Sequence, residues 1–386
     1  MTWRLQRVIL EKNKILIRDY FIPLAYSKEF NNNLNNKSFG KNIAINGIDD
    51  FDVDNSLDIV IFSINDLEFD SDNNLYYTKK IRKRLYSLSI GDWDLKILDL
   101  GIFKSGSQYS DTQFALSEIL NQLYLLKVKV IVINLCKNIT YDFYYALKQN
   151  NDIVNIVSVD NKIPKNSENS SLRKILDDEN CKLGEYSNVG FQKHINNVDE
   201  IELFKNMFFE TYSLGKIKNK IGNCEPIFRN SNLVDLSMRA VKSGDINNSH
   251  EFTNGLTSYE YCSISRFAGL SNNLDLISFS TSYQSSAISS LISEGIWYAI
   301  DGINSFIFEN IDLNSDNYLF YNVVVDNYDL KFVKSLITQR WWFSLENMNI
   351  VQMEKTYIPC VEDDYLLSKK SILSDRILMR IKNKIP

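Results

Sequence analysis

The chain has 386 residues, of which 44% are hydrophobic, which is enough for one large domain with or without an appendage. Its formal net charge of -5 comes from 43 basic and 48 acidic residues spread along the sequence. Nucleic-acid binders usually gather basic residues into one stripe, so this balance argues against a nucleic-acid partner.

The five cysteines, Cys136, Cys181, Cys224, Cys262 and Cys360, include no pair at CxxC spacing. An odd count without a zinc pattern is typical of free thiols in a reducing compartment. No apolar run reaches the length of a membrane span, and the first residues lack the uncharged apolar core of a signal peptide. We therefore expect a soluble, cytoplasmic protein that does not contact membranes.

Two β-branched runs, Leu57–Ile64 and Val128–Ile133, are typical of parallel strands that are buried on both faces. Between them, Tyr76–Leu88 has helical spacing, and Leu95–Leu98 reads as a short strand. Five basic residues of the helix are expected to lie largely outward as a solvated face: Lys79, Lys80, Arg82, Lys83 and Arg84.

The stretch before the second strand predicts a helix over Thr112–Leu126. Ser110 and Gln113 have the spacing of a capping box, which marks its start. The loop after the strand, Asn134–Tyr141, is expected at the carboxyl edge of the sheet, where open α/β folds bind ligands.

The same alternation of strands and helices continues toward the C-terminus. The expected elements are a helix at Tyr141–Gln149, strands at Ile153–Val159, Tyr186–Phe191, Leu233–Leu236 and Leu274–Ser280, and helices at Asp199–Leu214, Ser258–Ala268 and Ser286–Ile303. Repeated βα units of this length imply an α/β fold, a three-layer αβα sandwich with a mainly parallel sheet.

The pattern changes near Leu313, where short strand-like runs follow at hairpin spacing. We expect a main domain over residues 1–312 and a small antiparallel β appendage with a closing helix over residues 313–386. Trp341 and Trp342 are expected to be packed aromatic residues. The predicted strands are Tyr318–Val325, Leu330–Val333, Trp341–Leu345 and Thr356–Pro359, and the helix is Tyr365–Lys382.

The order and spacing of the segments in Leu57–Ile303 resemble the ureohydrolase family of arginases, agmatinases and formimidoylglutamases. The segments PxxRNSNLVDLSMRAV, TNGLTSYEYCSISRFAGLS, IWYAIDG and RWW…IPC…DDY resemble an arginase-like bacterial branch of it with degraded metal motifs. The resemblance implies an arginase-like fold. It also implies a C–N hydrolase with two manganese ions, which hold a hydroxide that attacks a guanidinium or formimidoyl carbon.

This sequence departs from the family's metal ligands at most of the aligned positions. Lys137 and Lys162 stand where the family has histidines, and Ser237 stands in place of an aspartate. Only Asp160 and Asp235 match family ligand positions. A lysine ammonium has no free lone pair at neutral pH and repels a divalent cation. We therefore expect no manganese and no other cofactor, and we assign no catalytic residue.

The remnant pocket that this alignment predicts consists of Lys137, Asn138, Asp160, Lys162, Asp235 and Ser237. Our hypothesis is that the two lysines neutralise the two aspartates in a buried ion-pair cluster that replaces the metals.

The preferred interpretation is a pseudoenzyme, an arginase-like and formimidoylglutamase-like protein that acts through binding or assembly, with a protein partner or as a homo-oligomer. One alternative is an active amidine or guanidine hydrolase, with ligands from the Asn161–Lys182 insertion, where Glu168, Asp177, Asp178 and Glu179 lie. Another is a binder of a small anionic ligand, attracted by Lys137 and Lys162.

Overall fold

The computed structural model describes residues 17–24, 33–65, 71–136, 138–164, 167, 170–248, 252–345 and 357–382. No helix within these ranges is long and apolar enough to cross a membrane.

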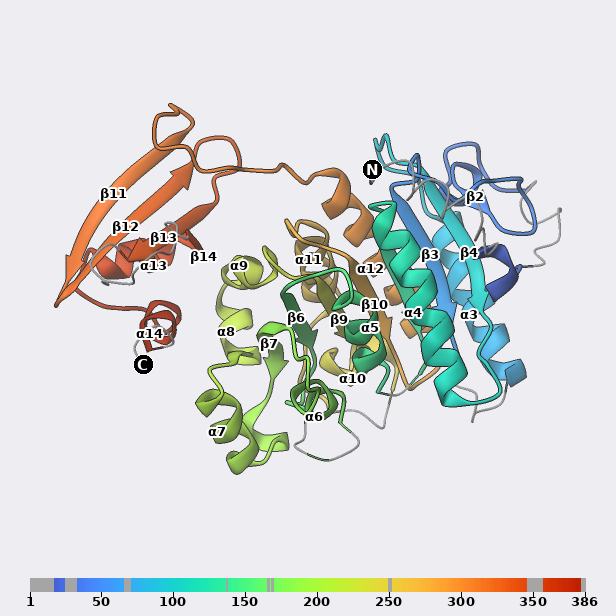
Figure 1. Cartoon of the computed structure of the whole chain (residues 1–386), viewed down its shortest axis with the longest axis horizontal. Helices are drawn as coiled ribbons and strands as arrows, with labels where there is room; N and C mark the ends of the chain where they lie inside the picture. Colours follow the sequence, from blue (N-terminus) through green and yellow to red (C-terminus); the bar gives the residue numbers. More distant parts are fainter. Residues whose placement is uncertain are drawn as a thin grey trace, which may run out of the picture.

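A ten-stranded sheet forms the centre of the molecule (Figure 1), and nine of its strands follow the order β1-β4-β3-β5-β10-β9-β6-β7-β8. All neighbours are parallel except β1 and β4, so the predicted mainly parallel sheet is confirmed. Strand β2 (Ala44–Ile45) lies off this path and pairs with β4. The other strands are β1 (Phe21–Ile22), β3 (Ile59–Ile64), β4 (Ile97–Phe103), β5 (Lys129–Asn134), β6 (Val154–Val159), β7 (Leu183–Phe191), β8 (Glu210–Ser213), β9 (Leu233–Ser237) and β10 (Leu276–Ser280).

Helices cover both faces of this sheet and give the three layers that the sequence predicts. Alternate strand residues enter two separate apolar cores, because successive side chains point to opposite faces. One core includes residues of α4 (Tyr109–Leu125), α5 (Thr140–Leu147), α6 (Ser171–Leu176) and α7 (Val198–Asn206). The other includes residues of α3 (Ser71–Ser87), α8 (Leu214–Asn219), α11 (Ser258–Gly269) and α12 (Ser286–Asn304).

A separate four-stranded antiparallel sheet follows in the order β11-β12-β13-β14. Its core contains a stack of aromatic rings, in which Trp341 lies 5.5 Å from Tyr321 and 5.1 Å from Tyr365 between ring centroids. The expected aromatic packing and antiparallel appendage are therefore present. The elements are β11 (Tyr318–Val325), β12 (Tyr328–Ser335), β13 (Trp341–Leu345), β14 (Ile358–Cys360), α13 (Glu362–Ser368) and α14 (Asp375–Lys382).

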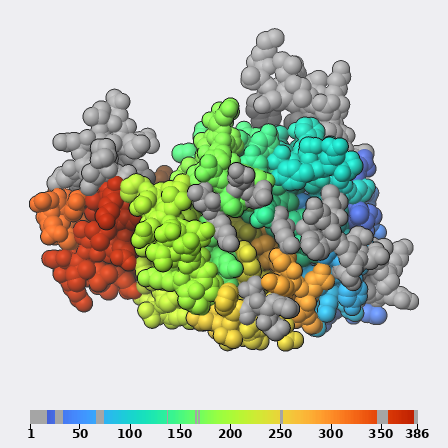
Figure 2. All heavy atoms as spheres, turned by 90° about the horizontal axis from the view of Figure 1, so that it is seen from below, coloured from blue at the N-terminus to red at the C-terminus, as the bar shows by residue number. Residues whose placement is uncertain are grey.

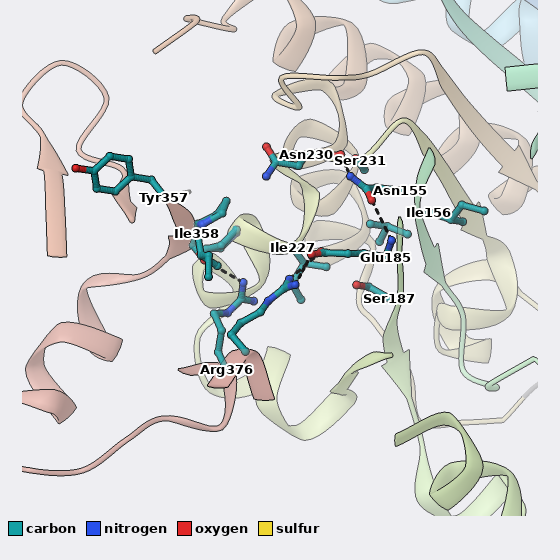
Figure 3. A pocket seen from close by; sticks show the side chains of 14 residues that line it. Asn155, Ile156, Glu185, Ser187, Ile227, Asn230, Ser231, Tyr357, Ile358 and Arg376 are labelled. Carbon is teal, nitrogen blue, oxygen red and sulfur yellow. Dashed lines mark hydrogen bonds and ion pairs between the residues drawn. The ribbon is translucent and has the colours of Figure 1, made fainter. Parts of the chain in front are cut away.

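Buried arginines join the small sheet to the main layers. Arg229, which follows the short helix α9 (Glu225–Phe228), donates to the carbonyls of Trp341 and Cys360 and lies over the Trp342 ring. From the other side, Arg376 of α14 lies 3.0 Å from a Glu210 carboxylate oxygen. Figure 3 shows Arg376 in this junction, and Figure 2 shows the red C-terminal residues against the yellow-green part of the chain.

Three local predictions are wrong, and tertiary contacts explain two of them. Helix α4 begins after Gln108, with no capping box at Ser110, because the Gln113 side chain donates to Asp142 at 2.7 Å instead. The predicted helix Asp199–Leu214 contains α7 and then the edge strand β8, whose pairing with β7 overrides the helical pattern. The predicted closing helix is split into α13 and α14, with Ser371 in a left-handed conformation between them.

Arg82 also differs from its prediction, because its side chain is fully buried and does not lie on the solvated face of α3. Its guanidinium donates two hydrogen bonds to the Asp99 carboxylate, at 2.8 and 3.1 Å, and one to the Gly101 carbonyl. The Tyr86 hydroxyl donates to the same carboxylate at 2.7 Å. This network satisfies a charge pair inside the core and ties α3 to β4.

Replacing Arg82 with alanine leaves the Asp99 carboxylate buried without its cation. We expect the Arg82→Ala variant to lose about 3–5 kcal/mol of unfolding free energy in urea titrations. Arg84→Ala, on the exposed side of the same helix, is the matched control and should change stability by less than about 0.5 kcal/mol. Equal effects of the two substitutions would contradict the structural role of the pair.

Candidate functional site

Four neighbouring strands, β5, β10, β9 and β6, end side by side and place polar side chains at one edge of the sheet. The register sets Ser280 level with Asn134 and Ser237, and it sets Ser278 level with Asp235. In-register residues of parallel strands point to the same face, as do residues two apart along one strand. The carboxyl ends of these strands therefore form a contiguous polar patch, whereas the residues earlier in each strand pack in the apolar core.

A cavity of about 490 Å³ lies over this patch at the carboxyl edge. This is the edge at which open α/β sheets bind ligands. Its lining also includes the beginnings of α5 and α6. The residues that line the cavity include Asn134, Asn138, Thr140, Ser158, Asp160, Lys162, Ile163, Ser167, Ser170, Ser171, Leu172, Ile175, Tyr186, Asp235, Ser237, Arg239, Ser280, Thr281 and Ser282.

Asp160 follows β6 and has both carboxylate oxygens engaged by protein donors. The backbone N–H of Lys162 donates to Oδ1 at 3.1 Å, and the Arg239 guanidinium donates to Oδ2. Asp160 is 5% exposed as a residue, whereas the Arg239 side chain is 45% exposed. The ion pair is therefore held between the cavity wall and its opening.

Asp235 lies within β9, and its Oδ1 atom is shielded from solvent and has no hydrogen-bond partner among the described residues. Burial raises the pKa of this carboxyl group to about 6, although its hydrogen bonds with the Ser278 and Ser280 hydroxyls lower the pKa. The nearby Asp160 charge raises it further, and Arg239 lowers it. The Asp235 carboxyl group thus has hydrogen bonds with Ser278 and Ser280, while its Oδ1 atom is left without a partner among the described residues.

The structure brings five of the six predicted pocket residues to this one cavity. Asn138, Asp160, Lys162, Asp235 and Ser237 all contribute to its lining. The sixth, Lys137, lies outside the described residues.

The alignment missed Arg239 and the many hydroxyl groups of the cavity. Arg239 lies two residues after Ser237 in the same sequence segment, so its proximity to a predicted pocket residue could have identified it as a candidate. Its contact with Asp160, which is 79 residues away in the sequence, was not predictable from that position.

The hypothesis that lysines neutralise both aspartates is wrong for Lys162. Among the described residues, the cation that pairs with Asp160 is Arg239, and Lys162 forms no ion pair with Asp160 or Asp235. The reason is geometric, because Lys162 approaches Asp160 through its backbone N–H.

Some acidic residues of the insertion were proposed as metal ligands. Those that the structure describes do not line the cavity. Asp177 pairs with Arg173, and Asp178 pairs with Lys148, both away from the lining. Glu179 is exposed, and Glu168 lies outside the described residues.

The described residues do not fit the two manganese ions that the family resemblance implies. A manganese pair needs several oxygen and imidazole ligands with free lone pairs, but both Asp160 oxygens accept hydrogen bonds from the protein. In the described part of the chain, no three histidine, cysteine, aspartate or glutamate side chains are arranged so that they could hold a metal ion. His194 packs against Phe252 and does not line the cavity.

The raised pKa of Asp235 makes stability depend on pH. Between about pH 4 and 6 the folded carboxyl group keeps a proton that the unfolded one has lost, so stability falls as pH rises through this window. We expect Asp235→Asn to remove that fall and to be more stable than the wild type by roughly 1–3 kcal/mol at pH 7.5. Urea unfolding of both proteins from pH 4 to 8 measures this difference in unfolding free energy.

Asp177→Asn, which changes an exposed carboxylate outside the cavity, is the control for this experiment. A difference between Asp235→Asn and the wild type that stays constant over the whole pH range would contradict the assignment.

Comparison with known proteins finds no matching protein-family model and no matching curated protein sequence. Solved structures do match. Formimidoylglutamase from Bacillus subtilis has a TM-score of 0.59 at 13% identity, over 78% of this chain and 100% of that chain. Trypanosoma cruzi formiminoglutamase with Mn²⁺ has a TM-score of 0.56 at 14% identity, over 67% of this chain and 97% of that chain.

An arginase superfamily protein from Trypanosoma cruzi also matches, with a TM-score of 0.54 at 15% identity over 67% of this chain and 96% of that chain. Likeness at this level of identity concerns the fold. The chain therefore has the arginase-like fold of the ureohydrolases, as the sequence resemblance predicted.

Proposed function

We propose that this chain is a non-catalytic protein of the arginase-like fold that binds a small polar molecule in the pocket at the carboxyl edge of its sheet. In this proposal, binding or assembly replaces hydrolysis, and manganese has no part. The ion pair between Arg239 and Asp160 is the observation that carries the proposal.

The charge of Arg239 is the first physical argument. A guanidinium stays protonated at every physiological pH and cannot act as a metal ligand. Because the Arg239 guanidinium donates to Asp160 Oδ2, it repels a divalent cation and occupies a lone pair of that oxygen, which the cation would need for coordination. Since Lys162 also lines the pocket, two positive side chains surround the place that the family gives to its metals.

The persistence of the cavity is the second argument. A site that had lost its metals without acquiring another role would be expected to fill with apolar side chains, because unpaired buried polar groups cost free energy. This cavity instead keeps polar side chains from β5, β6, β9 and β10 around an open volume. Its size lies in the usual range for small-molecule pockets.

Metal content and hydrolysis test this proposal directly. Protein purified from cells supplied with MnCl₂ should contain far less than one manganese per chain by mass spectrometry. It should release no ammonia or formamide from N-formimidoylglutamate and no urea from arginine. Trypanosoma cruzi formiminoglutamase, prepared in parallel, controls for metal loading.

About two manganese ions per chain together with turnover would overturn the proposal in favour of a working C–N hydrolase. Manganese without turnover would overturn the metal-free part of it.

The assembly and cellular location remain part of the same proposal. The five cysteines form no disulfide with one another, which supports a reducing compartment such as the cytoplasm. Light scattering on the purified protein would establish whether a second copy is the partner.

A further inference from the structure

The hydroxyl groups of the cavity suggest the chemistry of its ligand. Each serine or threonine hydroxyl can donate one hydrogen bond and accept others. Some of these hydroxyls are already engaged within the protein. Ser171 and Thr281 donate to backbone carbonyls, and Ser170 and Ser237 accept from backbone N–H groups. The donors and acceptors that remain suit a ligand that also combines both on neighbouring atoms. The hydroxyl-bearing residues of the lining, apart from Tyr186, are Thr140, Ser158, Ser167, Ser170, Ser171, Ser237, Ser280, Thr281 and Ser282.

The charges of the described lining residues cancel. Asp160 and Asp235 contribute two negative charges, and Lys162 and Arg239 contribute two positive charges. Asp160 is already paired with Arg239. Against the described lining, a ligand with a net charge would therefore lose its hydration without meeting a surplus of opposite charge, which favours a neutral ligand.

The Oδ1 atom of Asp235 gives the cavity a point of attachment. It is shielded from solvent and lacks a hydrogen-bond partner in the described part of the chain. An unsatisfied buried acceptor is costly, so a ligand group that donates to it gains affinity. A hydroxyl can do so through a charge-assisted hydrogen bond and remain neutral.

Apolar groups complete the lining on the side of α6. Ile163, Leu172 and Ile175 are buried there, and Tyr186 contributes an aromatic ring. Such a surface suits the C–H groups of a ring or chain whose hydroxyls point to the polar walls.

We propose that this pocket binds a neutral polyhydroxylated molecule, of the size of a monosaccharide or small polyol, with one ligand hydroxyl donating to Asp235. This inference rests on the proposed function, since it names the class of ligand for the same metal-free pocket.

Thermal-shift and calorimetric titrations of the full chain test this ligand class. The probes are D-glucose, D-ribose, myo-inositol and glycerol as neutral compounds, glycine and L-glutamate as amino acids, and inorganic phosphate and acetate as anions. We expect at least one neutral compound to raise the melting temperature by about 2–4 °C at millimolar concentration. The amino acids and the anions should give no shift.

Two variants locate the binding site. Asp235→Ala removes the acceptor and should weaken binding of the neutral compound at least tenfold, by about 1.4 kcal/mol or more. Asp177→Ala removes an exposed carboxylate of the same charge outside the cavity and should bind like the wild type. Binding that is unchanged in Asp235→Ala would overturn the inference.

The remaining outcomes separate this inference from the function on which it rests. Binding of only amino acids or only anions, lost in Asp235→Ala, would overturn the neutral ligand class and leave the pocket as a binding site. No shift with any probe would overturn the ligand class too, whereas manganese with turnover would remove the proposed function itself.

Discussion

The ion pair of Arg239 with Asp160 determines what the pocket at the sheet edge can do. It places a permanent positive charge on the Asp160 carboxylate at the edge of the pocket. It also balances the Asp160 charge, whereas the Oδ1 atom of Asp235 has no hydrogen-bond partner in the described part of the chain. The absence of fit to manganese, the retained cavity and the proposed ligand class all follow from this arrangement.

The sheet fixes where the residues of the pocket lie. Parallel strands with buried apolar residues fix the positions of β5, β10, β9 and β6. Residues toward their carboxyl ends, such as Asn134, Asp235 and Ser280, line the cavity. Substitutions at such positions can change the site while the apolar residues of the strands keep the core. The arginase-like architecture is shared with solved structures at 13–15% identity.

Much of the fold could be predicted from the sequence, because buried strands and amphipathic helices leave a local pattern. The predictions failed where a distant partner decided the outcome. Gln113 is drawn away from a capping position by Asp142, and Arg82 is buried because Asp99 neutralises it. The site shows the same limit. Alignment located Asp160 and Asp235, but Asp160 pairs with Arg239 of the short 3-10 helix Met238–Ala240, and these two segments meet only in the folded chain.

Anomalous diffraction at the manganese edge, from crystals grown with MnCl₂, tests the central claim most directly. The account predicts no anomalous peak in the pocket and the Arg239 guanidinium within hydrogen-bond distance of the Asp160 carboxylate. A peak bound by Asp160 and Asp235, with the Arg239 side chain turned away, would contradict it.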